Sequence, residues 1–276
     1  PRTPAINEAD VSDKPKWVQK LKRLGQPAQR QSDLRYRDQY RTMLAVHEMV
    51  RDLIATLEHT GQLDNTWLFF TSDNGQFYGE HRLPNGKGSL YEEGIRVPLV
   101  VRGPGVRRGA TDLLVCAADL LPTILDLARS AYGNIDGRSF ASSLTGTVPR
   151  AWRGACFVRY GVGNLRPAPA AAAATASAPA PAIERSDEDE TVRGGSVYGL
   201  RGHDWSYIHS LRTGEEEFYD LRDDPYQLAN AWDTLPAAAK SRLQQGLRDL
   251  CACQSESCHR VDASIPASAA DLRSLA

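Results

Sequence analysis

Residues 66–105 read TWLFFTSDNGQFYGEHRLPNGKGSLYEEGIRVPLVVRGPG. An apolar run at 67–70 leads directly into Asp73-Asn74-Gly75, and a second apolar run occupies 97–101. Both runs lack the alternation of a half-exposed strand, so we expect buried strands covered on both faces, as in a parallel sheet. A strand ending in Asp-Asn-Gly places a carboxylate and an amide oxygen at the carboxyl edge of a sheet, where open α/β sheets bind ligands.

Asp73 and Asn74 offer two hard oxygen ligands, which suit Ca²⁺ or Mg²⁺ better than a soft metal. The structural alternative is an Asx turn that closes the strand. The long loop at 73–94 also carries Lys87 between two glycines, which let the backbone approach an anion closely. A solvated loop lysine is the alternative there. His81, in the same loop, fits either a hydrogen bond to a substrate or a structural position.

The rest of the first 150 residues alternates helical and strand patterns. Residues 1–32 are polar and loop-like. Apolar residues recur at helical spacing from Leu34 to His59, which predicts an amphipathic helix lying on a sheet. A second helix begins at Asp119 and runs through Ala128. The order helix, strand, loop, strand, helix predicts an α/β domain over residues 1–150.

Residues 165–190 differ sharply from the rest, being rich in Ala and Pro and then acidic. Such a segment cannot build a core, so we expect a disordered insertion whose acidic run is solvated rather than metal-binding. The remaining residues, 191–276, are expected to form a smaller α+β subdomain. Its elements are short antiparallel strands and a terminal helix, at 197–200, 205–209, 217–221 and 236–250.

Composition excludes some functions and leaves others open. The net charge is −1, which gives no reason to expect nucleic-acid binding. We expect no membrane span, because no apolar stretch is long enough to cross a bilayer.

The chain has five cysteines. Three of them cluster near the end as C-x-C-x₄-C, where a short disulfide loop would imply an oxidising compartment. A zinc site that includes His259 is the alternative, but it lacks a second spaced ligand pair. Cys116 and Cys156 are expected to be small apolar core residues.

Several motifs together resemble the sulfatase family of the alkaline-phosphatase-like superfamily. The matching segments are 40–105, Asp119-Leu-Leu-Pro-Thr-Ile-Leu125, Asp136-Gly-Arg-Ser139, and Glu217-Phe-Tyr-Asp-Leu221 with Asp224-Pro225. The chain looks most like N-acetylglucosamine-6-sulfatases and their bacterial homologues. Cys253 and Cys258 are similar to a C-terminal cysteine pair in that group.

This resemblance implies hydrolysis of a sulfate ester, with a sulfated amino sugar of a glycosaminoglycan as the expected substrate. It implies that Asp73 and Asn74 bind a calcium ion, with Mg²⁺ as an alternative, and that Lys87 contacts the sulfate group. His81 is the further candidate for catalysis or substrate binding. The family's nucleophile is a formylglycine made from the Cys or Ser of a Cys/Ser-x-Pro-x-Arg motif.

The chain departs from the family in two ways. Relatives often have a His two residues after the Asp-Asn-Gly glycine, where this chain has Phe77 or Tyr78. No Cys or Ser is followed by x-Pro-x-Arg, and the family's first strands and first metal-binding acids have no counterpart. We therefore expect the C-terminal half of a sulfatase domain, with the N-terminal half as its missing partner, and no activity from this chain alone.

Two other functions remain open from the sequence. One is a phosphodiesterase or phosphonate monoester hydrolase built on the same metal scaffold. The other is an inactive sulfatase-like binding protein or truncated gene product. For a sulfatase, we expect an extracytoplasmic location: secreted, periplasmic or lysosomal.

Overall fold

The computed structural model describes residues 2–161 and 196–275. The first part of the chain contains α1 (Lys16–Gln19), α2 (Gln26–His59), η1 (Leu63–Asn65), β1 (Leu68–Thr71), α3 (Glu92–Ile95) and β2 (Leu99–Arg102). Next come η2 (Ala117–Asp119), α4 (Leu120–Leu127), α5 (Ala141–Leu144) and β3 (Ala155–Tyr160). The last part contains β4 (Val197–Gly202), β5 (Trp205–Ser210), β6 (Glu216–Asp220), η3 (Trp232–Thr234), α7 (Ala237–Ala252), α8 (Glu256–Ser264) and α9 (Ala269–Arg273).

The predicted helix at 34–59 is present, but α2 is longer and more exposed than expected. It begins at Gln26, where Pro27 occupies the first turn and its missing N–H costs nothing. Gly61 follows the helix with φ +66°, the left-handed conformation that ends many helices. Of all the residues in α2, Ser32 alone is buried, so the prediction that this helix lies on a sheet is wrong for this chain.

The two apolar runs form strands, but they are neither parallel nor fully covered. β1 and β2 pair antiparallel, with Phe69 opposite Val101 and Thr71 opposite Leu99. Both strands keep partly exposed residues. Parallel pairing needs a crossover connection, usually a helix, and the segment between these strands contains only the four-residue helix α3. The expectation of parallel, buried strands is therefore wrong for this pair.

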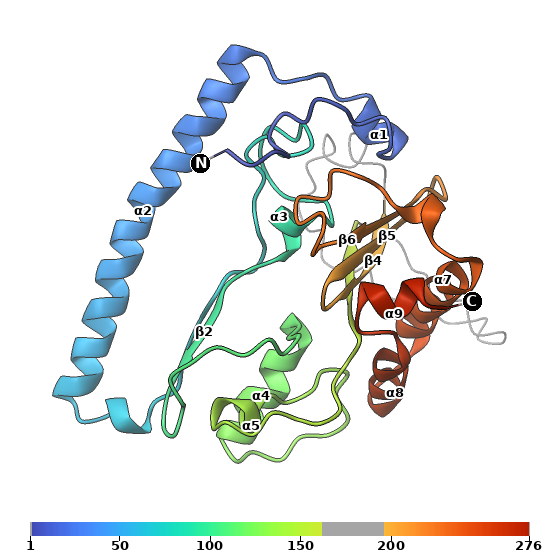
Figure 1. Ribbon diagram of the computed structural model, residues 1–276. Helices are drawn as coiled ribbons and strands as arrows, with labels where there is room; N and C mark the ends of the chain where they lie inside the picture. Colours follow the sequence, from blue (N-terminus) through green and yellow to red (C-terminus); the bar gives the residue numbers. More distant parts are fainter. Residues whose placement is uncertain (1, 162–195, 276) are drawn as a thin grey trace, which may run out of the picture.

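The C-terminal strands and helix are confirmed. β3, β4, β5 and β6 form an antiparallel sheet in that order. Figure 1 shows α7, α8 and α9 beside this sheet. Trp205 and Phe218 from the sheet and Leu243 from α7 have no exposed surface. They belong to a core in which aromatic and aliphatic side chains pack between the sheet and the helices. The sequence analysis missed β3, which forms the first edge of this sheet.

Two disulfides tie the chain together. Cys253 and Cys258 are bonded, as the resemblance implied. Cys116 and Cys156 are also bonded, so the expectation that they are free core residues is wrong. Their bond connects the start of η2 to β3 across 40 residues of sequence, a pairing that spacing alone cannot reveal.

A buried ion pair lies beside the Cys116–Cys156 disulfide. The Arg153 guanidinium donates to both carboxylate oxygens of Asp119 at 2.7 Å, and neither side chain is more than 3% exposed. Asp119 also accepts from the backbone N–H of Cys116 and of Arg138. The Asp119 that the sequence places at a helix start is therefore a buried structural anchor.

Two expectations fall outside what the structure tests. The insertion at 165–190, with its acidic run, lies outside the described residues. The division into domains at 1–150 and 191–276 stays a prediction, and one apolar cluster contains Phe77 and Tyr91 from the first range together with Ile208 from the second. Among the described residues, no helix is long and apolar enough to cross a bilayer.

Candidate functional site

The Asp-Asn-Gly segment follows β1 at an open surface. The Asp73 side chain is 82% exposed and the Lys87 side chain is 61% exposed, while Asn74 is half-buried. Asp73 Oδ1 accepts a hydrogen bond from the Asn74 backbone N–H at 2.9 Å, while the Gly75 N–H, which an Asx turn would use, donates to Gly94 O instead. This contact uses one carboxylate oxygen and leaves the second one facing Lys87.

Lys87 lies against both of these residues. Its ammonium donates a hydrogen bond to Asn74 Oδ1 at 2.8 Å and lies 3.8 Å from Asp73 Oδ2. The structure therefore brings these three residues together, although Lys87 is 13 positions from Asn74. Their assignments as metal ligands and sulfate contact stay predictions.

Backbone contacts hold the two sides of the loop at this distance. The Gly75 N–H donates to Gly94 O at 3.0 Å, and the Phe77 N–H donates to Gly86 O at 2.9 Å. A Cβ on Gly75 would lie 1.9 Å from Glu93 O, so only glycine permits this approach. The loop is thus folded back on itself, and this fold brings the Lys87 region to the Asp73 region.

His81 occupies a different position from the other three residues. Its side chain is fully buried, with Nδ1 2.7 Å from Glu8 Oε2 and Nε2 3.8 Å from Glu93 Oε2. The imidazole ring packs on Tyr91 with a centroid separation of 4.1 Å. This geometry favours the structural alternative for His81, and its direct contact with a substrate stays a prediction.

The N-terminal segment is part of the support of this loop, which the sequence analysis missed. The Arg82 guanidinium donates to the backbone carbonyls of Glu8, Ala9 and Leu21 at 2.9–3.0 Å. The Asn7 N–H donates to Gly79 O at 2.7 Å. The segment 1–32, which the sequence predicted to be a polar loop, therefore binds residues 79–82 through hydrogen bonds. The sequence analysis missed these contacts because residues that pair across 73 positions leave no local pattern in the sequence.

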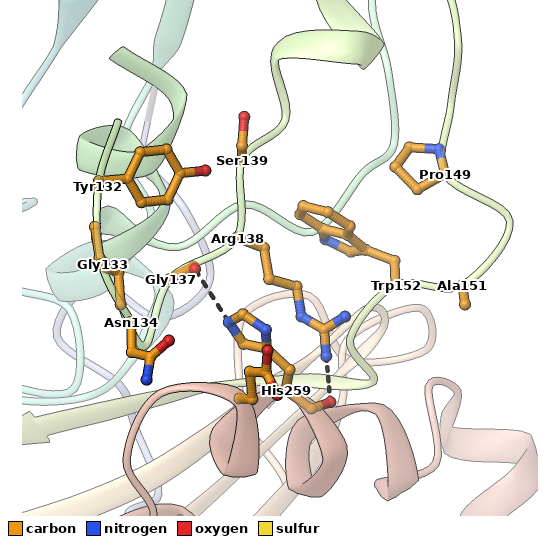
Figure 2. A pocket seen from close by; sticks show the side chains of 12 residues that line it. Tyr132, Gly133, Asn134, Gly137, Arg138, Ser139, Pro149, Ala151, Trp152 and His259 are labelled. Atoms are coloured by element: carbon orange, nitrogen blue, oxygen red, sulfur yellow. Dashed lines mark hydrogen bonds between the residues drawn. The ribbon is translucent and has the colours of Figure 1, made fainter. Parts of the chain in front are cut away.

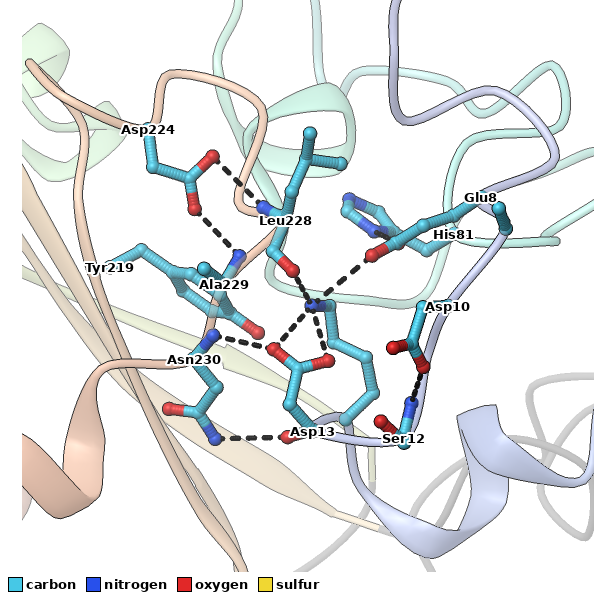
Figure 3. Close-up of polar contacts among 12 residues, drawn as sticks. Glu8, Asp10, Ser12, Asp13, His81, Tyr219, Asp224, Leu228, Ala229 and Asn230 are labelled. Carbon is cyan, nitrogen blue, oxygen red and sulfur yellow. Dashed lines mark hydrogen bonds and ion pairs between the residues drawn. The ribbon is translucent and has the colours of Figure 1, made fainter.

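A buried lysine, Lys14, connects this N-terminal segment to the chain after β6, and Figure 3 labels its partners Glu8, Asp13 and Leu228. Lys14 Nζ has no exposed side-chain surface; it donates to Leu228 O at 2.8 Å and pairs with Asp13 and Glu8. It also lies 5.4 Å from the centre of the Tyr219 ring. The positive charge of Lys14 is thus balanced by the carboxylates of Asp13 and Glu8. Its hydrogen bond to Leu228 O attaches the N-terminal segment to the chain after β6.

Glu217 is the buried acid next to this lysine. Its carboxylate accepts hydrogen bonds from Tyr219 at 2.5 Å and Tyr91 at 2.9 Å. Burial raises the pKa of Glu217 to about 7, and these two hydrogen bonds only partly oppose the effect. Burial also raises the pKa of Glu93, which faces His81. The support of the loop therefore contains two carboxyl groups whose pKa is raised by burial, and that of Glu217 lies near neutral pH.

The neighbouring Glu92 makes structural contacts. It forms a two-pronged ion pair with Arg201 at 2.8 and 2.9 Å and lies 4.0 Å from Arg96. His47 is on the exposed surface of α2.

The donor atoms at Asp73 and Asn74 fit a hard cation in type but not in number. Ca²⁺ takes six to eight oxygen ligands, and these residues offer two side chains. No group of three or more His, Cys, Asp or Glu in the described part of the chain could hold a metal ion. The Lys87 ammonium already contacts these side chains, donating to Asn74 Oδ1 and lying near Asp73 Oδ2. These residues can therefore be only part of a complete metal site.

A separate pocket of about 440 Å³ lies between the loop at 132–139 and α8. Figure 2 shows Tyr132 and Trp152 on its sides, with Arg138 and His259 between them. Arg138 is held by the His259 carbonyl and the Asp262 carboxylate. No residue expected from the sequence to act in catalysis lines this pocket.

Comparisons with known proteins agree with the resemblance seen in the sequence. The sulfatase family model matches residues 10–130. The arylsulfatase of Volvox carteri is 32% identical over 273 residues, which cover 92% of this chain and 40% of the relative. The N-acetylglucosamine-6-sulfatase of Capra hircus is 33% identical over 235 residues, covering 82% of this chain and 42% of the relative.

Solved structures show the same relationship. A protein in complex with its substrate D-glucosamine-2-N,6-O-disulfate is 30% identical, with a TM-score of 0.55, over 75% of this chain and 38% of its own. The phosphonate monoester hydrolase of Agrobacterium radiobacter is 25% identical, with a TM-score of 0.52, over 71% of this chain and 36% of its own. This chain spans about two fifths of the length of these relatives. Its similarity to these relatives, which have the alkaline-phosphatase-like fold, together with the matching family model, shows that the chain belongs to the sulfatase family.

Proposed function

We propose that this chain contributes metal-binding and sulfate-binding residues to a sulfuric ester hydrolase. The observation that carries the proposal is the contact of Lys87 with Asn74 and Asp73 at an open strand end, in a chain of the sulfatase family. An ammonium group beside two hard oxygen ligands is the arrangement needed to place a metal-bound sulfate next to a fixed positive charge.

Each residue has a role that follows from its chemistry. Asp73 and Asn74 would hold Ca²⁺, or Mg²⁺, which supplies positive charge at the oxygens of the transferring sulfuryl group. Lys87 would bind a peripheral sulfate oxygen, where negative charge is held during transfer. His81, buried against Glu8, would fix the loop that carries Lys87.

The nucleophile is proposed to lie outside this chain. No Cys or Ser in the sequence has the x-Pro-x-Arg sequel of a formylglycine site. The N-terminal half of a sulfatase domain would supply this nucleophile and the remaining metal ligands. For this reason we expect no turnover by the 276-residue chain on its own.

A sulfated amino sugar is the proposed substrate. Relatives at 32–33% identity include N-acetylglucosamine-6-sulfatases, and the solved relative at 30% identity holds a disulfated glucosamine. An aryl sulfate is the simplest probe, because other relatives at 30–32% identity are arylsulfatases.

Hydrolysis of a phosphonate monoester is the second candidate, supported by the structural similarity to the Agrobacterium enzyme. An inactive sulfatase-like protein is the third. An extracytoplasmic location is also proposed, since two disulfides are typical of chains that fold in oxidising compartments.

A chimeric enzyme tests the proposal. This chain would replace the matched 273-residue segment of the Volvox arylsulfatase, and turnover would be measured with an aryl sulfate, N-acetylglucosamine 6-sulfate and a phosphonate monoester. We expect sulfate-ester hydrolysis that falls by about 100-fold or more in Asp73→Ala and Lys87→Ala, the usual scale for loss of a charge-stabilising group. Tyr226→Ala, an exposed residue far from Lys87 in the sequence, is the control.

Three results would contradict the proposal. A folded chimera with full activity after both substitutions would remove Asp73 and Lys87 from the site. A chimera that hydrolyses only the phosphonate would favour the second candidate, and a folded chimera without any turnover would favour the inactive one.

A further inference from the structure

One short segment gathers positive charge in a chain whose charges are otherwise balanced. The chain has 33 Lys and Arg against 34 Asp and Glu. Between Asp13 and Asp33 there is no acidic residue, whereas six cations occur there: Lys14, Lys16, Lys20, Lys22, Arg23 and Arg30. Of these six, only Lys14 is buried. We call residues 16–23 the basic segment, because they hold four of the five exposed cations.

The apolar residues of the basic segment face inward. Val18 has no exposed surface, and Trp17 and Leu21 pack against one of the two apolar clusters. The exposed cations of the segment are Lys16, Lys20, Lys22 and Arg23. The segment therefore has an apolar inner side, which holds it on the molecule, and a positive outer side.

The positive charge is not neutralised within the chain. Lys20, Lys22 and Arg23 have no ion-pair partner in the part of the chain that the structure describes. A nearby acid, Glu215, accepts a hydrogen bond from the backbone N–H of Lys16 at 2.8 Å rather than from a cationic side chain. Cations grouped in this way repel one another and attract anions from solution. The outer side of the segment is therefore available to an anionic partner.

The basic segment is attached to the loop that carries Lys87. Arg82, in that loop, donates from Nη1 to Leu21 O at 3.0 Å. Leu24, which follows the segment, packs so closely on the loop that a Cβ on Gly79 would lie 3.1 Å from its Cδ1. Figure 1 shows the connection between α1 and α2 along the edge of the molecule. A polymer bound along this connection therefore lies beside the loop.

The composition of the segment favours one class of anionic polymer. Single-stranded nucleic acids need aromatic side chains on which bases stack, and the one aromatic residue of the segment, Trp17, packs inward. Anionic membranes need apolar side chains on the same side as the cations, and those of the segment also face inward. A sulfated polysaccharide needs only an array of exposed Lys and Arg for its sulfate groups.

We propose that Lys20, Lys22 and Arg23 bind sulfate groups of a polysaccharide chain, so that the hydrolase takes a sulfated polymer rather than a free monosaccharide. The choice of a sulfated polymer rests on the proposed function, whereas the charge of the surface does not. Ionic contacts of this kind raise the local concentration of a charged substrate and its rate of association. The basic segment is thus a second binding surface, separate from the contacts of Lys87.

Binding of a fluorescent heparin octasaccharide to the full 276-residue chain tests the proposal, with anisotropy measured at several salt concentrations. Lys20→Gln, Lys22→Gln and Arg23→Gln together should weaken binding at low salt by about 100-fold, the scale for three cations at an anionic surface. The slope of log K against log salt concentration should also become shallower by about two, because three fewer contacts release counterions.

A matched triple variant controls for net charge. Arg108→Gln, Arg150→Gln and Arg260→Gln remove the same charge at exposed positions outside the segment. They should change the affinity by no more than about twofold, because distant surface charges are screened by salt. Thermal unfolding should be the same for both triple variants and the wild type, since all six side chains are exposed.

Several results would overturn the proposal. Equal losses of affinity in the two triple variants would show that net charge alone matters. Equal binding of a chemically desulfated octasaccharide would remove the role of sulfate. Tighter binding of single-stranded DNA of the same charge, lost in the basic-segment variant, would assign the surface to nucleic acid.

The binding measurement is independent of turnover, so the two proposals can fail separately. A wild-type chain that does not bind the octasaccharide rejects this inference, even if the chimera hydrolyses sulfate esters. Binding that is lost in the basic-segment variant, with a folded chimera that has no turnover, keeps the polysaccharide-binding surface and rejects the proposed hydrolase.

Discussion

The Lys87 ammonium donates a hydrogen bond to Asn74 Oδ1 at 2.8 Å across the folded loop. The same oxygen is the one proposed to bind a divalent cation. An ammonium and a metal ion that both contact one amide oxygen repel each other, so the two should compete in this chain when no sulfate is present.

Lys87→Met should therefore tighten the weak binding of Ca²⁺ to this chain by up to about fivefold, since exposed ion pairs are worth at most about 1 kcal/mol. Asp73→Ala should abolish that binding. Titration calorimetry with Ca²⁺ measures both effects. Submicromolar affinity that survives Asp73→Ala would show that the ion binds elsewhere.

Gly75→Ala should destabilise the chain by about 1–3 kcal/mol, the usual range for overpacking a close contact. The new Cβ would lie 1.9 Å from Glu93 O and force apart the segments that hold Asn74 near Lys87. Thermal unfolding measures the loss. Gly133→Ala is the matched control, because nothing lies within 4 Å of its added Cβ; equal effects at both positions would refute the close approach.

Removal of the two disulfides should have unequal effects. In the chain-entropy model, the 40-residue loop closed by Cys116–Cys156 is worth about 4 kcal/mol, and the five-residue loop of Cys253–Cys258 about 2 kcal/mol. The variant in which Cys116 and Cys156 are both replaced by alanine should thus unfold at a lower denaturant concentration than the corresponding variant of Cys253 and Cys258. Cys251→Ala, at a half-buried free cysteine, controls for loss of the side chain, and the reverse order of stability would contradict the model.

Glu217→Gln should make the chain more stable at pH 8 while changing little at pH 4. Burial raises the pKa of Glu217 to about 7 from 4.5, so the folded state favours the protonated acid. This contribution is fully present below about pH 4.5 and is lost as the pH rises to about 7. The amide cannot ionise, so the variant should gain on the order of 3 kcal/mol relative to wild type across that window.

Chemical denaturation at several pH values checks this change. Gln can still accept the hydrogen bonds that Tyr91 and Tyr219 donate to Glu217, so packing should be preserved. A stability difference between the two proteins that does not vary with pH would mean that Glu217 is not protonated in the folded chain at neutral pH.

The sequence was most informative where the signal was local. Periodicity identified the body of α2 and of α7, and short strand-like runs separated by turns identified β4, β5 and β6. The resemblance to the family pointed to Asp73, Asn74 and Lys87, which the structure brings into contact. Each of these inferences needed only neighbouring residues or a strand–loop–strand arrangement.

The failures arose where distant residues decide the environment. Cys116 and Cys156 read as apolar because nothing near either of them indicates a partner. Lys14 lies in the segment 1–32, which we predicted to be a polar loop, yet it is buried by contacts to Glu8 and to Leu228, 214 positions away. The antiparallel pairing of β1 and β2 depends on the connection between them rather than on their composition.

The long helix also determines where the chain can be cut. Its five arginines lie at positions 30, 35, 37, 41 and 51, and nearly all of the helix is open to solvent. Trypsin should therefore nick the isolated polypeptide first within α2, while the sheet of β3, β4, β5 and β6 survives as a resistant remnant. If another part of a sulfatase fold packed on α2, it would protect these cleavage sites. The lifetime of the chain in a cell would then depend on whether α2 is covered before a protease cleaves it.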